Sequence, residues 1–218
     1  MPKTEKTPTM QEQLLYKALA EQNIKNYRIR VSHKVGISFV NNLPLGIKYP
    51  KYFLKKCNEL AQEKKYKYVF KGGFSTSQSS VTIDRKTILD PFIKRHDSCI
   101  LETKQGIKRS SKTDVDVEYF QLIANGEYSL CPNWAGRWWD HDYAWTYRFI
   151  ESCFAKSIPI LFRQAPIGQP FYRDIFFFWS DEDHKLSKSE YQDIVESNYE
   201  KAVKYYTLQT NEIEILKK

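Results

Sequence analysis

The run Tyr66-Lys67-Tyr68-Val69-Phe70 is a short, apolar, strand-like segment that leads into the glycine turn Lys71-Gly72-Gly73. Its neighbours in the chain are helix-length amphipathic segments, over Lys51–Lys64 before it and Arg85–His96 after it. The next strand is predicted at Ser98–Leu101. Strands that alternate with helices form right-handed β-α-β crossovers, so this stretch predicts a largely parallel sheet with helices on both faces.

The same alternation continues along the rest of the chain. Further strands are predicted at Tyr128–Cys131, Ile158–Phe162 and Ile175–Phe178, and further helices at Val115–Ala124, Tyr143–Ala155 and Lys188–Thr207. The pattern therefore predicts a Rossmann-like α/β domain over residues 51–218, whose ligand would lie at the carboxyl ends of the strands.

The first 50 residues follow a different pattern. A helix is predicted over Met10–Gln22, followed by short strands at Tyr27–Val31 and Val35–Val40 and by a turn or linker at Asn41–Gly46. Residues 1–50 are too few for a second Rossmann-like domain. We therefore expect a short N-terminal α/β appendage or a reduced acceptor region, with a boundary near Pro50.

Composition narrows the class of protein. With 218 residues, 41% hydrophobic and 15% aromatic, the chain is long and apolar enough for one globular domain, which excludes collagen-like and wholly disordered chains. It contains no run of about 18 apolar residues, and its N-terminus lacks the apolar run of a secretory signal. We therefore expect a soluble, cytoplasmic protein without a membrane span.

Cysteine spacing and net charge bear on ligands. Cys57, Cys99, Cys131 and Cys153 include no pair at metal-ligand separation, so reduced thiols are expected and no metal site is predicted. The net charge of +8 favours anionic partners, which include nucleic acid, membrane surfaces and phosphorylated small molecules. Charge alone does not choose among these partners.

Two groups of residues near predicted strand ends suit a phosphorylated ligand. Gly72 and Gly73 precede a run of serine and threonine residues, which offers close backbone approach and hydroxyl donors to a phosphate. Arg148 and Glu151 are three residues apart and share one helix face. Arginine is a forked donor for phosphate, and glutamate accepts hydrogen bonds from ribose hydroxyls; an ion pair within the helix is the alternative interpretation.

Three sequence runs together resemble the signature of exostosin-type glycosyltransferases. They are Tyr128-Ser129-Leu130-Cys131-Pro132, Tyr147-Arg148-Phe149-Ile150-Glu151 and Ser157-Ile158-Pro159-Ile160. Upstream, Tyr68-Val69-Phe70-Lys71-Gly72 and Arg85 are similar to the family's Phe-x-Gly strand end and the arginine of its next helix. The resemblance covers roughly Tyr66 to Trp179, about half of the chain.

The resemblance implies the nucleotide-sugar-binding half of a GT-B fold. It further implies an inverting, metal-independent transfer from a nucleotide sugar, usually a UDP-sugar, to a glycan or other hydroxyl acceptor, with no added cofactor. By the same resemblance, Glu151 would hold the ribose and Arg148 would lie near the diphosphate, with Gly72, Gly73 and Arg85 lining the phosphate region.

An inverting transfer needs a general base and positive charge near the departing diphosphate. Asp140, His141 and Asp142 lie in a loop after a predicted strand and are the candidates for the base. Arg109 and Arg137 are further candidates for binding phosphate. In the same loop, Trp134, Trp138, Trp139 and Trp145 suit stacking on sugar or uracil rings, with packing of the loop as the alternative.

Two acidic motifs also have a capping interpretation. Asp142 precedes the predicted helix over Tyr143–Ala155 and suits its N-cap. Asp114-Val115-Asp116 matches the metal-binding Asp-x-Asp of GT-A glycosyltransferases, but it lies at a predicted helix start, where acids complement the helix dipole. The chain also departs from the exostosin pattern at Lys156-Ser157, where that family usually has glycine.

Two other functions are open at this stage. The first is a nucleic-acid-binding module, in which the positive charge and the aromatic loop would bind the phosphate backbone and stack on bases. The second is a non-catalytic nucleotide-sugar-binding half domain. Because the N-terminal part is short, completion of an active cleft by a homodimer is a further hypothesis.

Overall fold

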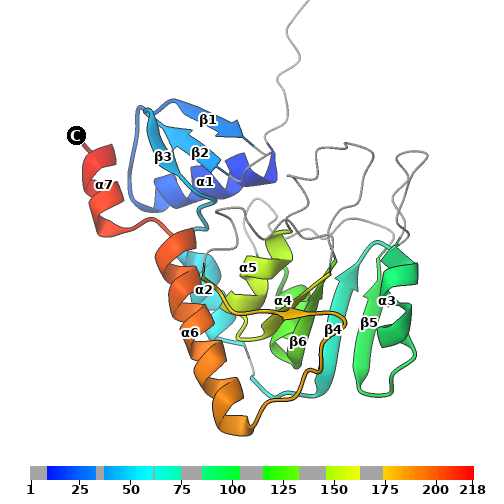
Figure 1. Cartoon of the computed structure of the whole chain (residues 1–218). Helices are drawn as coiled ribbons and strands as arrows, with labels where there is room; N and C mark the ends of the chain where they lie inside the picture. The colour runs from blue at the N-terminus through cyan, green and yellow to red at the C-terminus, as the bar shows by residue number, and fades with distance from the viewer. Residues whose placement is uncertain are drawn as a thin grey trace, which may run out of the picture.

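Five parallel strands form the main sheet of the computed structural model, which describes residues 9–32, 37–60, 62–74, 85–103, 115–132, 146–162 and 174–218 (Figure 1). The strands are β4 (Tyr66–Gly72), β5 (Ser98–Glu102), β6 (Gly126–Cys131), β7 (Ile158–Leu161) and β8 (Phe178–Trp179), and their order is β5-β4-β6-β7-β8. All neighbours pair in parallel. The strand order reverses between β4 and β6, as in doubly wound folds. The predicted parallel, Rossmann-like sheet is therefore confirmed.

Helices cover both faces of this sheet. They are α2 (Lys51–Asn58), α3 (Arg85–Ile93), α4 (Val117–Ala124), α5 (Tyr147–Phe154) and α6 (Lys188–Tyr206). On one face, Phe70 and Tyr128 of the strands pack with Leu89 of α3. On the other face, α2, α4 and α5 share a second core around Phe53 and Phe149. Because both faces are covered, the central strands are apolar at consecutive positions.

Two predicted helices differ from the observed ones. The helix predicted over Lys51–Lys64 ends at Asn58, after two turns. The helix predicted over Tyr143–Ala155 is observed from Tyr147, and the side chain of Thr146 accepts a hydrogen bond from a backbone N–H of its first turn. Thr146 is therefore the N-cap of α5, and the prediction that Asp142 has this role was wrong.

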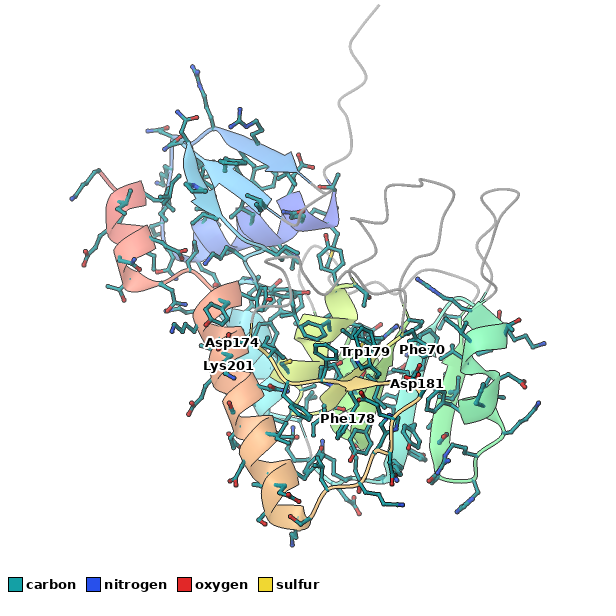
Figure 2. All side chains as sticks on the ribbon, viewed as in Figure 1. Phe70, Asp174, Phe178, Trp179, Asp181 and Lys201 are labelled. Atoms are coloured by element: carbon teal, nitrogen blue, oxygen red, sulfur yellow. The ribbon has the colours of Figure 1, made fainter. Side chains whose placement is uncertain are left out.

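The segment before β8 is fixed to α6 by polar contacts. The amide of Asn198, which is buried on α6, accepts a hydrogen bond from the backbone N–H of Phe176 and donates one to its carbonyl, both at 2.8 Å. Figure 2 shows Asp174 beside Lys201 of α6, whose Nζ donates to the Asp174 carbonyl at 2.7 Å. Strand β8 is confined to Phe178–Trp179, shorter than the predicted Ile175–Phe178 strand, because the preceding residues bond to the helix instead.

The N-terminal region forms a small unit of its own. It consists of α1 (Met10–Glu21) and a three-stranded antiparallel sheet of β1 (Ile29–Ser32), β2 (Ile37–Val40) and β3 (Leu43–Leu45). Asn41 and Asn42 both have positive φ, as a two-residue hairpin turn requires. The prediction of a turn or linker over Asn41–Gly46 was therefore wrong after Asn42, because β3 is an edge strand, where Pro44 is tolerated.

A C-terminal helix that was not predicted, α7 (Thr210–Leu216), belongs with this small unit. Leu208 and Leu216 pack in one cluster with Leu15 and Leu19 of α1 and Val40 of β2. Figure 1 shows α7 beside the three-stranded sheet. We use "small unit" for α1, β1–β3 and α7 together, so it draws on both ends of the described chain.

Residues 48–49 and 206–207 run side by side between the small unit and the main sheet. The backbone N–H of Tyr49 donates to Tyr206 at 2.7 Å, and Tyr49 forms a parallel bridge with Thr207. Lys48, only 3% exposed, donates to the Thr207 carbonyl at 3.0 Å and forms an ion pair with Glu212 of α7 at 2.8 Å. An ammonium at the C-terminal end of α6 also complements the helix dipole. The small unit lies on the side toward which the parallel strands point (Figure 1).

Within the described ranges, no helix is long and apolar enough to cross a membrane.

Candidate functional site

The candidate site lies where the strand order reverses, at the carboxyl ends of β4 and β6. In open parallel sheets this position leaves a crevice, because the connections from the two strands run to opposite faces. Here β4 leads to α3 on one face, while β6 leads to α5 on the other. Helix α5 starts at the carboxyl edge, which places Arg148 in its first turn beside the end of β4.

The guanidinium of Arg148 is the central group of the site. Arg148 is only 4% exposed, and its Nη2 donates to the Lys71 carbonyl at 2.6 Å. The guanidinium carbon, Cζ, lies 4.3 Å from the ring centroid of Phe70 and 5.7 Å from that of Tyr119. Its Nε is buried and has no hydrogen-bond partner among the described residues. A buried unpaired donor costs about 1–3 kcal/mol, so an acceptor brought to Nε would stabilise the site.

Gly72 permits this close approach. A Cβ on Gly72 would lie 2.9 Å from Cζ of Phe70 and 3.1 Å from Nη2 of Arg148. A side chain here would force the Phe70 ring or the Arg148 guanidinium to shift. The structure therefore brings Gly72 and Arg148, predicted separately as ligand residues, into direct contact.

Two more of the predicted ligand residues meet at the same strand end. Arg85 is the first residue of α3, and its Nη1 donates to the Gly73 carbonyl at 3.3 Å. A positive charge at a helix N-terminus is unfavourable with the helix dipole unless an anion or another acceptor is present. Arg85 and Arg148 thus place two guanidinium groups at the carboxyl end of β4.

Glu151 lies one turn after Arg148 and is fully buried. One carboxylate oxygen accepts a hydrogen bond from the Tyr119 hydroxyl at 2.7 Å, and the other accepts from the Tyr49 hydroxyl at 3.2 Å. In this arrangement the carboxylate is bound by the two tyrosine hydroxyls and holds Tyr119 beside Arg148. The ribose contact implied by the resemblance therefore requires Tyr49 or Tyr119 to move aside.

Sequence reasoning did not identify Tyr49, Tyr119 or Phe70 as site residues. Tyr119 packs against both Arg148 and Glu151, so its ring and its hydroxyl each contact one of the predicted residues. The only sequence signal was its place on the apolar face of a predicted helix. Tyr49 gave no signal, because it reaches Glu151 across 102 residues of sequence.

Several predicted residues lie outside the described part of the chain. These are the candidate bases Asp140, His141 and Asp142, the arginines Arg109 and Arg137, and the tryptophans Trp134, Trp138, Trp139 and Trp145. Asp114 also lies outside, whereas Asp116 is the N-cap of α4 and accepts from the Tyr119 N–H at 2.9 Å. The capping interpretation of Asp116 is thus confirmed. Among the described residues, no group of three or more histidine, cysteine or acidic side chains is placed to hold a metal.

Buried thiols lie near the site but do not suit nucleophilic chemistry. Cys57, Cys131 and Cys153 are buried and, like Cys99, not in disulfides. Burial raises the pKa of Cys131 to about 11 and also raises the pKa of Cys57 and Cys153. These thiols are therefore protonated at neutral pH and act as core residues.

A scan against protein-family models finds no match to this chain, and a search of curated proteins finds none either. The geometry of the site therefore carries the argument about function.

Proposed function

We propose that this protein is a GT-B-type glycosyltransferase that binds a nucleotide sugar, of the UDP-sugar class, at the carboxyl edge of β4 and β6. The observation that carries the proposal is the buried guanidinium of Arg148, whose Nε has no partner among the described residues. It lies at the strand-order reversal, against a glycine that leaves room for it. A diphosphate supplies acceptor oxygens of the charge that this donor requires.

The proposed reaction is an inverting transfer. The acceptor hydroxyl oxygen forms a bond to the anomeric carbon while the bond from that carbon to the diphosphate oxygen breaks. The departing diphosphate gains negative charge, which Arg148 and Arg85 would stabilise. A base takes the proton of the acceptor hydroxyl, and Asp140, His141 and Asp142 remain the candidates. The small unit lies on the same side of the sheet, where an acceptor region is needed (Figure 1).

The test measures nucleotide binding to wild type and to matched arginine variants. Titration calorimetry with UDP, GDP, CDP and ADP is expected to show selective binding of UDP. Arg148→Lys keeps the charge but loses the forked donor, so the UDP affinity should fall about tenfold or more. Arg95→Lys is the control, because Arg95 is exposed and pairs with Asp97 at 2.7 Å, away from the proposed site.

Three outcomes separate the candidate functions. UDP binding that depends on Arg148, with release of UDP from a UDP-sugar in the presence of acceptor, supports the transferase. UDP binding without turnover supports the non-catalytic half domain. Absence of nucleotide binding together with salt-sensitive binding of single-stranded DNA would exclude the proposal in favour of a nucleic-acid-binding module.

A further inference from the structure

A cavity lies at the amino edge of the main sheet, opposite the proposed nucleotide site. Its volume is about 560 Å³, within the range of small-molecule sites. One wall is the first turns of α6, including Lys188 and Gln192, and the other includes Glu127 of β6 and Lys156 before β7. Glu127 and the carboxyl end of β6 are four residues apart, so this part of the cavity is roughly 13 Å from that end of the strand.

The charges that line the cavity do not balance. Three lysines face two glutamates. Lys156 forms an ion pair with Glu196 at 2.9 Å, and the negative charge of Glu127 acts on Lys64. Lys188 has no ion-pair partner among the described residues. The lining therefore has one positive charge in excess, which suits a ligand with a single anionic group.

The remaining lining groups suit the body of such a ligand. Tyr128, Leu186 and Val195 provide an apolar surface, and the side-chain amides of Gln62 and Gln192 provide donors and acceptors beside it. An apolar surface with a few polar groups is typical of a site for a small organic molecule. Free phosphate would use the charge but not the apolar surface.

Lys156 lines this wall although its backbone conformation favours glycine. Lys156 follows α5 with φ of 55°, a left-handed conformation that glycine adopts with less strain. Its ammonium bonds to Glu196 and lies 5.3 Å from the ring centroid of Tyr199 on α6. A glycine would suit the backbone better but would leave this wall of the cavity without its ion pair.

We propose that the cavity between the start of α6 and the amino ends of β6 and β7 is a binding site for a small organic monoanion with an apolar body. Lys188 holds the anionic group, and Tyr128, Leu186 and Val195 contact the body. The site is separate from the proposed nucleotide site and does not depend on it.

Benzoate is the probe, because it joins one carboxylate to an apolar ring. Two compounds serve as controls: benzamide, which is the neutral counterpart of benzoate, and inorganic phosphate, which is an anion without an apolar body. Amide NMR titration of the full chain is expected to show benzoate shifts confined to Leu186–Glu196, Glu127 and Lys156. Lys188→Gln should weaken benzoate binding about tenfold. Lys185→Gln is the control, because Lys185 is exposed like Lys188 but does not line the cavity and pairs with Asp183.

A second variant, Lys156→Gly, removes the lysine while relieving the left-handed backbone, so a folding defect does not obscure the result. It should leave the melting temperature close to that of wild type and change the benzoate shifts at Glu196. Equal benzoate affinity in wild type and Lys188→Gln would overturn the proposal. Benzamide binding as tight as benzoate binding, or shifts spread over surface lysines, would also overturn it.

Discussion

The two edges of the main sheet use positively charged side chains in opposite ways. At the amino edge, the Nζ of Lys64 donates to three backbone carbonyls, of Ala124, Gly126 and Lys156, at 2.7 to 3.0 Å. At the carboxyl edge, Arg148 donates to the Lys71 carbonyl and packs on two aromatic rings, and its Nε has no partner among the residues that the structure describes.

This difference separates a structural cation from one available to a ligand. The Lys64 ammonium donates to carbonyls at and just after the C-terminal ends of α4 and α5. Carbonyls at a helix end have no partner within the helix, so they need a donor from elsewhere. Burial lowers the pKa of Lys64 to about 8, so it remains mostly charged at pH 7 and can make all three hydrogen bonds. The contacts of Arg148 orient its guanidinium but leave Nε without a partner among the described residues. This arrangement suits the binding of a ligand more than the stabilisation of the fold.

The largest effect is expected when Lys64 loses its ammonium. Lys64→Met leaves three partly buried carbonyls without their shared donor, and the free energy of unfolding should fall by about 3 kcal/mol. Urea denaturation followed by circular dichroism measures it. Lys65→Met is the matched control, because Lys65 is exposed and its ion pair with Glu63 lies on the surface. The free energy of unfolding should change by no more than about 0.5 kcal/mol in this variant. Similar losses in both variants would remove the distinction between the two edges.

An intermediate effect is expected at the carboxyl edge from the tyrosines behind Glu151. Tyr119→Phe keeps the ring beside Arg148 but removes the 2.7 Å hydrogen bond to a buried carboxylate. The free energy of unfolding should fall by about 2 kcal/mol. Tyr49→Phe, which removes the longer 3.2 Å bond, should cost about 1 kcal/mol. Chemical denaturation of both variants checks the order, and a larger loss for Tyr49→Phe would contradict the assigned geometry.

A smaller, pH-dependent effect is expected from His184. Its Nε2 donates to the Trp179 carbonyl at 2.8 Å, which leaves Nδ1 to accept from the Tyr68 hydroxyl at 3.0 Å. Burial lowers the pKa of His184, so the folded state binds its proton less readily than the unfolded state. Its contribution to stability is therefore present above the unfolded pKa of about 6.5 and is lost as the pH falls through the folded pKa.

Urea denaturation at a series of pH values between 7.5 and 5 measures this effect. The slope due to His184 should not exceed about 1.4 kcal/mol per pH unit, and His184→Gln should remove it. His96→Gln, at an exposed histidine, is the control substitution. An unchanged slope in His184→Gln would contradict the assigned role.

Local patterns in the sequence were sufficient to predict the parallel sheet. The apolar runs at β4, β6 and β7 and the amphipathic helices between them follow simple periodicity. They also sufficed to select Gly72, in a glycine turn after a predicted strand, and Arg148, which shares a predicted helix face with Glu151. What escaped prediction depends on distant contacts: the pairing of Lys48 with Glu212, the bond from Tyr49 to Glu151, and the packing of α7. None of these has a local signature.

The composition of the small unit has a consequence for biosynthesis. Leu45 of β3 and Leu216 of α7 belong to one cluster but are separated by about 170 residues. At a synthesis rate of roughly 5–20 residues per second, the first strands wait about 10–30 s before the last helix is made. The main sheet can therefore form on the ribosome while the earlier small unit is still incomplete, so folding does not proceed in simple N-to-C order.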